Sequence, residues 1–150
     1  MKKIETLAIG DELLTGRISD TNSTFIANQI FAMGFRLDRQ TVIPDDKEVI
    51  RKTLLDAAER AEVVICFGGL GPTSDDKTAE VVAEMLGCEL VIDSPSRERL
   101  ENYYASRNRP VTPQALKQVL YPKAGKALSN QAGMAPGIFC QIKNAKFFFL

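Results

Sequence analysis

Residues 67–76, FGGLGPTSDD, come directly after the apolar run EVVIC at 62–66 and lead into DKTAEVVAEMLG at 76–87. The apolar run is rich in β-branched residues, which is typical of a strand covered on both faces. The segment after the glycines has apolar residues at helical spacing and ends in Gly87, a common helix C-cap. The stretch therefore predicts a buried strand, a glycine-rich loop and a helix.

Two further units of strand and helix come before this one. The runs at 2–10 and 35–43 have the pattern of strands, while 19–34 and 45–61 place apolar residues at helical spacing. Strands that alternate with helices predict right-handed crossovers and a mainly parallel sheet with helices on both faces. Farther along we expect helices at 94–108 and 112–120, then strands at 137–143 and 146–150 joined by a hairpin-like turn.

The composition is that of one globular domain spanning residues 1–150. Hydrophobic residues make up 45% and charged residues 25%, and the 19 basic residues balance the 19 acidic ones. Because there is no net basic charge, we do not expect a nucleic-acid partner. There is no apolar stretch near the length of a membrane span and no signal-peptide core, so we expect a cytoplasmic protein without a membrane partner.

The histidine and cysteine content limits the chemistry. The chain has no histidine, which excludes Ser-His-Asp and Cys-His catalysis and every histidine-based metal site. Its three cysteines lie far apart and form no CxxC pair, so neither a disulfide framework nor a zinc site is expected. Catalysis would have to use carboxylates, lysines, hydroxyls or backbone amides.

The glycine loop has the features of a phosphate-binding site. It follows a strand and precedes a helix amino terminus, where backbone N–H groups favour anions. Neither the Walker pattern nor the dinucleotide fingerprint is present. Asp75 or Asp76 could be the N-cap of the next helix, which needs only one of them. Alternatively, both could hold a divalent cation against a phosphate, and the spacing alone favours neither reading.

Paired acids also follow the two other predicted parallel strands. Because the carboxyl ends of parallel strands meet at one edge of a sheet, these acids could converge there. Each pair alone is typical of acids that stabilise a helix start. Thr21 and Asn22 could bind the ligand or cap a helix, and Lys77 could neutralise phosphate or be solvated. The candidate metal ligands are Asp11, Asp45, Asp75 and Asp76.

Four segments together resemble a known family: GDELLTGRISDTN, VIPDD, GGLGPTSDDKT and LSNQAGMAPG, in this order. They are similar to the amino-terminal domain of the CinA (competence/damage-inducible protein A) family, within the MoaB/MogA molybdopterin-binding superfamily. The resemblance implies a three-layer α/β/α sandwich whose sheet is mostly parallel with one antiparallel strand. It also implies self-association as a dimer or trimer.

The resemblance assigns roles to individual residues. The essential acids of the superfamily's adenylyltransferase branch match Asp45 and Asp76, which we expect to be catalytic. Residues of the glycine motif match the phosphate-binding stretch, and residues of the SNxxGxAPG motif are implied to line the same pocket. These residues are Gly68, Gly69, Gly71 and Thr73 in the first motif, and Ser129, Asn130, Gly133 and Pro136 in the second.

CinA-type domains are associated with metal-dependent hydrolysis of ADP-ribose and related dinucleotide pyrophosphates in pyridine nucleotide recycling. We therefore expect a nucleotide pyrophosphatase that uses Mg²⁺, Mn²⁺ or Co²⁺. One alternative is a non-catalytic domain that binds molybdopterin or a nucleotide phosphate. Another is adenylyl transfer to molybdopterin, which is disfavoured because Leu70 replaces the threonine of the transferases' GGTG motif.

The family pattern extends farther than this sequence. Family members continue beyond the last apolar strand with a PGVP loop, and full CinA proteins add a nicotinamide-nucleotide amidase domain. The sequence stops at Leu150. We therefore expect the domain to lack its carboxyl-terminal segment.

Overall fold

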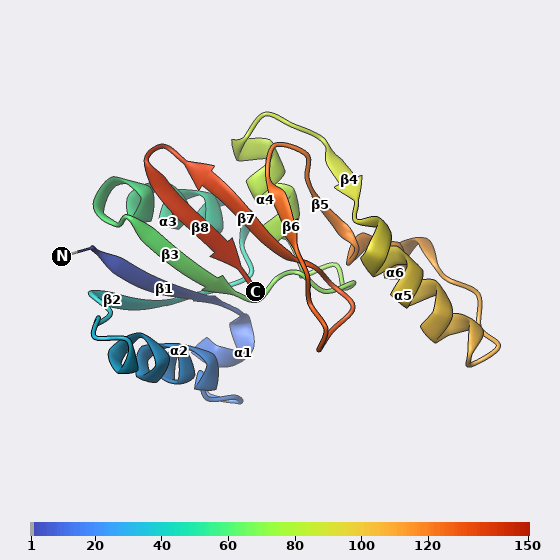
Figure 1. Cartoon of the computed structure of the whole chain (residues 1–150), viewed down its shortest axis with the longest axis horizontal. Helices are drawn as coiled ribbons and strands as arrows, with labels where there is room; N and C mark the ends of the chain where they lie inside the picture. The colour runs from blue at the N-terminus through green and yellow to red at the C-terminus, as the bar shows by residue number, and fades with distance from the viewer. Residues whose placement is uncertain (1) are drawn as a thin grey trace.

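A mixed sheet with the strand order β2-β1-β3-β8-β7-β6 forms the centre of the structure, a computed structural model that describes residues 2–150 (Figure 1). Strands β2, β1, β3 and β8 are parallel, and β7 is antiparallel to both β8 and β6. Within residues 2–150, β7 is thus the one reversed strand of this sheet, as predicted. The strands are β1 (Ile4–Ile9), β2 (Arg39–Ile43), β3 (Val63–Phe67), β6 (Lys126–Leu128), β7 (Gly137–Ile142) and β8 (Ala145–Phe149).

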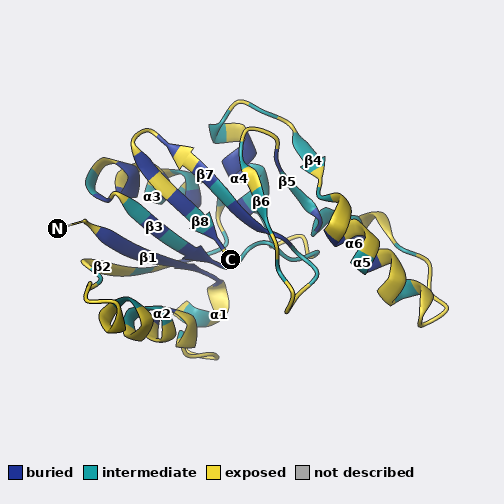
Figure 2. Cartoon of the chain, viewed as in Figure 1, coloured by how far each residue is buried: buried dark blue, intermediate teal, exposed yellow. Residues whose placement is uncertain are grey.

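Helices cover the two faces of the sheet unequally. Helices α3 and α4 pack against one face, where Leu7 and Phe147 belong to the main hydrophobic core. Helix α2 lies along β1, and Ser23 is its buried residue. Ile65 and Phe148, which alternate with core residues of β3 and β8, are only half-buried. Figure 2 shows that burial changes along both of these strands. The predicted α/β fold is thus confirmed. The helices that pack on the sheet are α2 (Thr21–Ala32), α3 (Lys47–Arg60) and α4 (Thr78–Met85).

A second part of the chain projects from the sheet (Figure 1). Strands β4 and β5 form an antiparallel pair, and helices α5 and α6 enclose a small core of Leu100, Ala115 and Val119. The helix predicted to reach residue 120 ends at Lys117, because residues 120–122 pair with β4 instead. The elements of this part are β4 (Leu90–Ile92), α5 (Ser94–Ala105), α6 (Pro113–Lys117) and β5 (Leu120–Pro122).

A buried ion pair joins the first strand to the end of α3. The side chain of Glu5 is 6% exposed and lies on the face of β1 that α3 covers. Arg60 donates from Nε to Oε1 and from Nη2 to Oε2 of Glu5, both at 2.8 Å. This two-pronged contact satisfies both carboxylate oxygens, which a buried charge requires.

None of the helices in the described part of the chain has the length and apolar character that crossing a membrane requires.

Candidate functional site

The carboxyl ends of three adjacent parallel strands bring the predicted acids together. Asp11 follows β1 and begins the short helix α1 (Asp11–Leu14), Asp45 follows β2, and Asp75 and Asp76 follow the glycine loop after β3. All four line one hollow of about 540 Å³. Because β2, β1 and β3 are neighbours in the sheet, loops distant in sequence meet here. Gly68, Gly69 and Thr73 line the same hollow.

The two acids after β2 have different roles. Asp46 is the N-cap of α3, since its Oδ1 accepts hydrogen bonds from the backbone N–H groups of Glu48 and Val49, both at 3.0 Å. Asp45 points to the hollow and accepts from the backbone N–H of Asp11 at 3.1 Å. The helix start therefore uses one carboxylate and leaves the other facing the cavity.

Asp76 closes a turn of the glycine loop. Its Oδ2 accepts from the backbone N–H of Thr73 at 2.8 Å and from the Thr73 hydroxyl at 2.5 Å. Helix α4 begins at Thr78, and its N-cap is Lys77, with no side-chain capping bond. The reading of Asp75 or Asp76 as the cap of this helix is therefore wrong. The Asp76 carboxylate instead accepts hydrogen bonds within the turn at residues 73–76, which precedes the helix.

The acids of this hollow raise the free energy of each other's charged forms. Burial raises the pKa of Asp45 above its ordinary value, and the hydrogen bond from the Asp11 N–H lowers it again. The negative charges of Asp11, Glu12 and Asp76 add to the rise. Within residues 2–150, none of these acids takes part in an ion pair. A bound cation would offset this repulsion.

The first two glycines of the loop adopt backbone conformations that other residues rarely reach. Gly68 has φ 99° and Gly69 has φ 72°, as expected for a loop that needs positive φ. A Cβ atom at Gly68 would lie 2.1 Å from the carbonyl oxygen of Ile9. The close approach that glycine permits here is to the protein's own first strand, and it keeps the loop against the end of β1.

Replacing Gly68 with alanine is expected to destabilise the fold by about 3 kcal/mol, because left-handed strain adds to a backbone overlap that cannot relax. Gly87 is the matched control, since it has φ 62° and open space around the added Cβ. Gly87→Ala should lose only about 1 kcal/mol. Urea unfolding of both variants measures the difference, and equal losses would show that the contact with Ile9 carries no cost.

Several predicted ligand residues lie outside the acid-lined hollow. Lys77 does not line this hollow and is not simply solvated, because its Nζ donates to the backbone oxygen of Asp45 at 2.9 Å. Thr21 and Asn22 line a smaller hollow of about 140 Å³ that also contains Gly68. They do not cap α2, whose N-cap is Asp20. Gly71 packs beside Asp76.

The SNxxGxAPG segment borders two other hollows. Ser129, Asn130 and Pro136 line a mainly apolar hollow of about 260 Å³ together with Leu70 of the glycine loop. Gly133 lies in a separate hollow beside α5. The Asn130 side chain holds the segment in shape, since it donates to Ala135 O and accepts from the N–H groups of residues 132 and 133. These four residues therefore lie outside the acid-lined hollow, and Ser129, Asn130 and Pro136 meet the glycine loop at Leu70.

Sequence reasoning missed part of the lining supplied by residues 12–17. Helix α1 was not predicted, because four residues show no helical period. It places Glu12 on the hollow, and a turn through Gly16 at φ 72° brings Arg17 there with Thr15. Arg17 is the only basic residue that lines this hollow in the part of the chain that the structure describes. The GDELLTGR motif was the available signal.

Residues 5–150 match the family model described as "Probable molybdopterin binding domain". The chain belongs to this family. Among solved structures, it resembles the protein CinA "with unknown function" from Thermoplasma acidophilum, with a TM-score of 0.86 and 33% identity over 99% of this chain and 87% of that one. The resemblance to CinA proteins is thereby confirmed.

The chain is also similar to longer CinA-like proteins and to a more distant solved structure. A CinA-like protein of Syntrophomonas wolfei is 37% identical over all of this chain, which spans 36% of that relative's length. The molybdopterin biosynthesis enzyme MoaB of Thermus thermophilus covers 100% of this chain and 80% of its own, with a TM-score of 0.61 at 21% identity. That likeness shows the shared fold of the CinA-like domain and MoaB.

Proposed function

We propose that this CinA-like domain is a metal-dependent nucleotide pyrophosphatase, with ADP-ribose or a related dinucleotide as substrate and a role in pyridine nucleotide recycling. The observation that supports this most is the meeting of Asp11, Asp45 and Asp76 from three loops beside the glycine loop. Carboxylates that lack basic partners suit a divalent cation, and the neighbouring loop suits phosphate.

The residues present fit a cation that is shared with the substrate. Within residues 2–150, no three acidic or cysteine side chains are placed to hold a metal ion by themselves. Mg²⁺ typically binds one or two carboxylates plus substrate phosphates, so a complete protein cage is not needed. Asp45 and Asp76 would hold the ion, with Asp11 and Asp75 as further ligands. Bound Mg²⁺, Mn²⁺ or Co²⁺ would neutralise charge on the phosphoryl oxygens.

The proposed reaction is hydrolysis of the phosphoanhydride. A water oxygen bonds to one phosphorus, the bond from that phosphorus to the bridging oxygen breaks, and the bridging oxygen leaves with the other phosphate. ADP-ribose and water thus yield AMP and ribose 5-phosphate. Of Asp45 and Asp76, a carboxylate that does not bind the ion would accept the proton of the water.

A binding domain without catalysis is the second candidate. The mainly apolar hollow beside Leu70 and Pro136 would suit a flat ring such as a pterin or a nucleobase. Molybdopterin or a nucleotide could then be held with its phosphate at the glycine loop and no bond broken. Adenylyl transfer to molybdopterin remains the least favoured proposal, because of Leu70.

One panel of reactions separates these functions. ADP-ribose, NAD, FAD, coenzyme A and molybdopterin would each be incubated with Mg²⁺, Mn²⁺ or Co²⁺, molybdopterin also with ATP, and the products identified by mass spectrometry. We expect AMP and ribose 5-phosphate from ADP-ribose, and no products after EDTA removes the metal. Intact substrates with every metal, together with calorimetric binding, would favour the binding domain. Adenylylated molybdopterin would favour transfer.

Self-association as a dimer or trimer is also a proposal. Large apolar side chains are exposed along α2 and just beyond it, with Phe25 61%, Phe31 76% and Met33 68% exposed. Large exposed apolar side chains are a feature of surfaces that contact another chain. Sedimentation equilibrium would measure the subunit number.

A further inference from the structure

A hollow of about 400 Å³ lies between α5 and residues 131–134, apart from the acid-lined hollow. Its wall combines aliphatic and aromatic side chains with a guanidinium and a carboxamide. Small-molecule sites typically have this mixture, with an apolar wall and a few polar groups that orient the ligand. The residues that matter here are Arg99, Leu100, Tyr103, Tyr104, Gln118 and Met134.

Arg99 supplies a positive charge that has no direct carboxylate partner among the described residues; the Asp93 carboxylate is reached only through the Ser96 hydroxyl. Within the described residues, no carboxylate lies within 4.0 Å of its guanidinium nitrogens. Its Nη2 donates to the Ser96 hydroxyl at 2.9 Å, whereas its Nε is buried and has no hydrogen-bond partner. The buried Nε is out of reach of a ligand, but a half-buried guanidinium without a carboxylate partner still favours an oxyanion, because its planar array of N–H groups matches a carboxylate or phosphate.

The aromatic wall of the hollow is held in place before any ligand arrives. Tyr103 and Tyr104 contact edge to face, with ring centroids 5.8 Å apart. The Arg107 guanidinium lies 3.7 Å from the centroid of the Tyr103 ring, and Tyr104 packs against the small core of α5 and α6. Fixed aromatic rings offer contact area to another ring with little loss of side-chain entropy.

The amide group of the hollow is also oriented. Nε2 of Gln118 donates to the backbone oxygen of Ala115 at 3.0 Å. This hydrogen bond fixes the orientation of the Gln118 side-chain amide. Met134 enters from the SNxxGxAPG segment and packs against the core around Leu100. The segment that borders the apolar hollow near Leu70 therefore forms one side of this hollow as well.

We propose that this hollow binds a small aromatic oxyanion, a planar ring that carries a carboxylate or a phosphate. Arg99 binds the oxyanion, and Tyr103 and Tyr104 contact the ring. The site is independent of the proposed hydrolysis, since it contains none of the acids of the first hollow and needs no metal.

The test measures binding of benzoate, phenyl phosphate and inorganic phosphate to the whole chain in buffer without divalent metal, by calorimetry and by shifts of backbone amide signals in NMR spectra. We expect the better aromatic probe to bind at least about tenfold more tightly than inorganic phosphate. The two aromatic probes show whether a carboxylate or a phosphate is preferred. Shifts should concentrate at Tyr104 and Gly133, not at Asp11 and Asp45.

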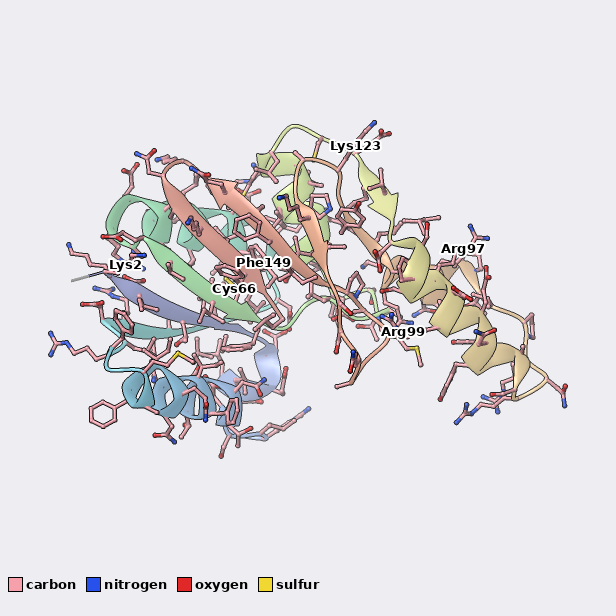
Figure 3. All side chains as sticks on the ribbon, viewed as in Figure 1. Lys2, Cys66, Arg97, Arg99, Lys123 and Phe149 are labelled. Carbon is pink, nitrogen blue, oxygen red and sulfur yellow. The ribbon has the colours of Figure 1, made fainter. Side chains whose placement is uncertain are left out.

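Two arginines of α5 make a matched pair of variants. Arg97 and Arg99 leave the helix on different sides, and Arg97 pairs with Glu101 at 2.7 Å (Figure 3). Arg99→Gln should weaken the binding of the aromatic probe at least about tenfold. The affinity of Arg97→Gln for this probe should stay within about twofold of that of the unchanged protein. Arg99→Lys, which keeps the charge but not the fork, should lie between them.

The proposal fails if no aromatic probe binds at millimolar concentration, or if the amide shifts appear only at the acid-lined hollow. It fails equally if Arg97→Gln and Arg99→Gln weaken binding by the same factor, since that result would indicate diffuse charge attraction. Unfolding curves of each variant show whether a loss of binding reflects a loss of structure.

Discussion

Replacing Asp45 with asparagine is expected to lower kcat/KM for ADP-ribose hydrolysis about 100-fold or more. The substitution keeps the size of the side chain and removes the carboxylate that would hold the metal or accept a proton. Asparagine also keeps an oxygen that can accept the hydrogen bond from the Asp11 N–H. The measurement is steady-state hydrolysis with saturating Mn²⁺, and Asp76→Asn should give a loss of similar size.

Asp46→Asn is the control for this prediction. It removes the same charge one residue away, and asparagine caps a helix about as well as aspartate does. We expect its kcat/KM to stay within about twofold of the unchanged protein, because the Asp46 carboxylate is used by α3. If both variants lost activity equally, the loss would come from overall charge, and Asp45 would have no special role.

Replacing Arg60 with alanine is expected to destabilise the fold by about 3 to 5 kcal/mol. The substitution would leave the carboxylate of Glu5 buried without its two guanidinium donors. A lone buried charge costs far more than the pair contributes, because the hydrogen bonds from Arg60 no longer offset the desolvation of the carboxylate. Urea unfolding at neutral pH measures this change in the free energy of unfolding.

An exposed ion pair supplies the comparison. Arg97 and Glu101 are both about half exposed, so Arg97→Ala should cost less than about 1 kcal/mol. Replacing Glu5 and Arg60 together with methionine should recover most of the stability lost in Arg60→Ala, since no charge remains buried. If Arg60→Ala and Arg97→Ala lowered the free energy of unfolding equally, burial of the Glu5 carboxylate would not add to the cost of losing its partner.

The sequence predicted the parts of the fold that have a long enough local pattern. Runs such as 45–61 and 62–67 carry a helical or apolar period, and the corresponding elements α3 and β3 are present. Strands β4, β5 and β6 have three residues each, which is too short for alternation to be visible. Pairing between β4 and β5 depends on segments about 30 residues apart, so no local signal could reveal it.

The candidate site was predictable to the same extent. Acids at the ends of neighbouring strands could be placed at one edge because topology brings those ends together. Lys77 and Gly133 could not be placed, since their positions depend on the path of two loops through space. Whether Asp76 caps a helix or closes a turn is likewise decided by its contact with Thr73.

Because β7 runs opposite to the parallel strands, the β7–β8 hairpin lies at the edge of the sheet opposite to the glycine loop. Because β7 begins where the parallel strands end, the connection from β6 arrives on the same side as the glycine loop, while the hairpin near Lys143 lies at the opposite pole. That pole carries none of the proposed ligand contacts. A fluorophore or an immobilising tag attached at Asn144 would therefore leave ligand access undisturbed, which makes this turn the anchor point for surface-based binding assays.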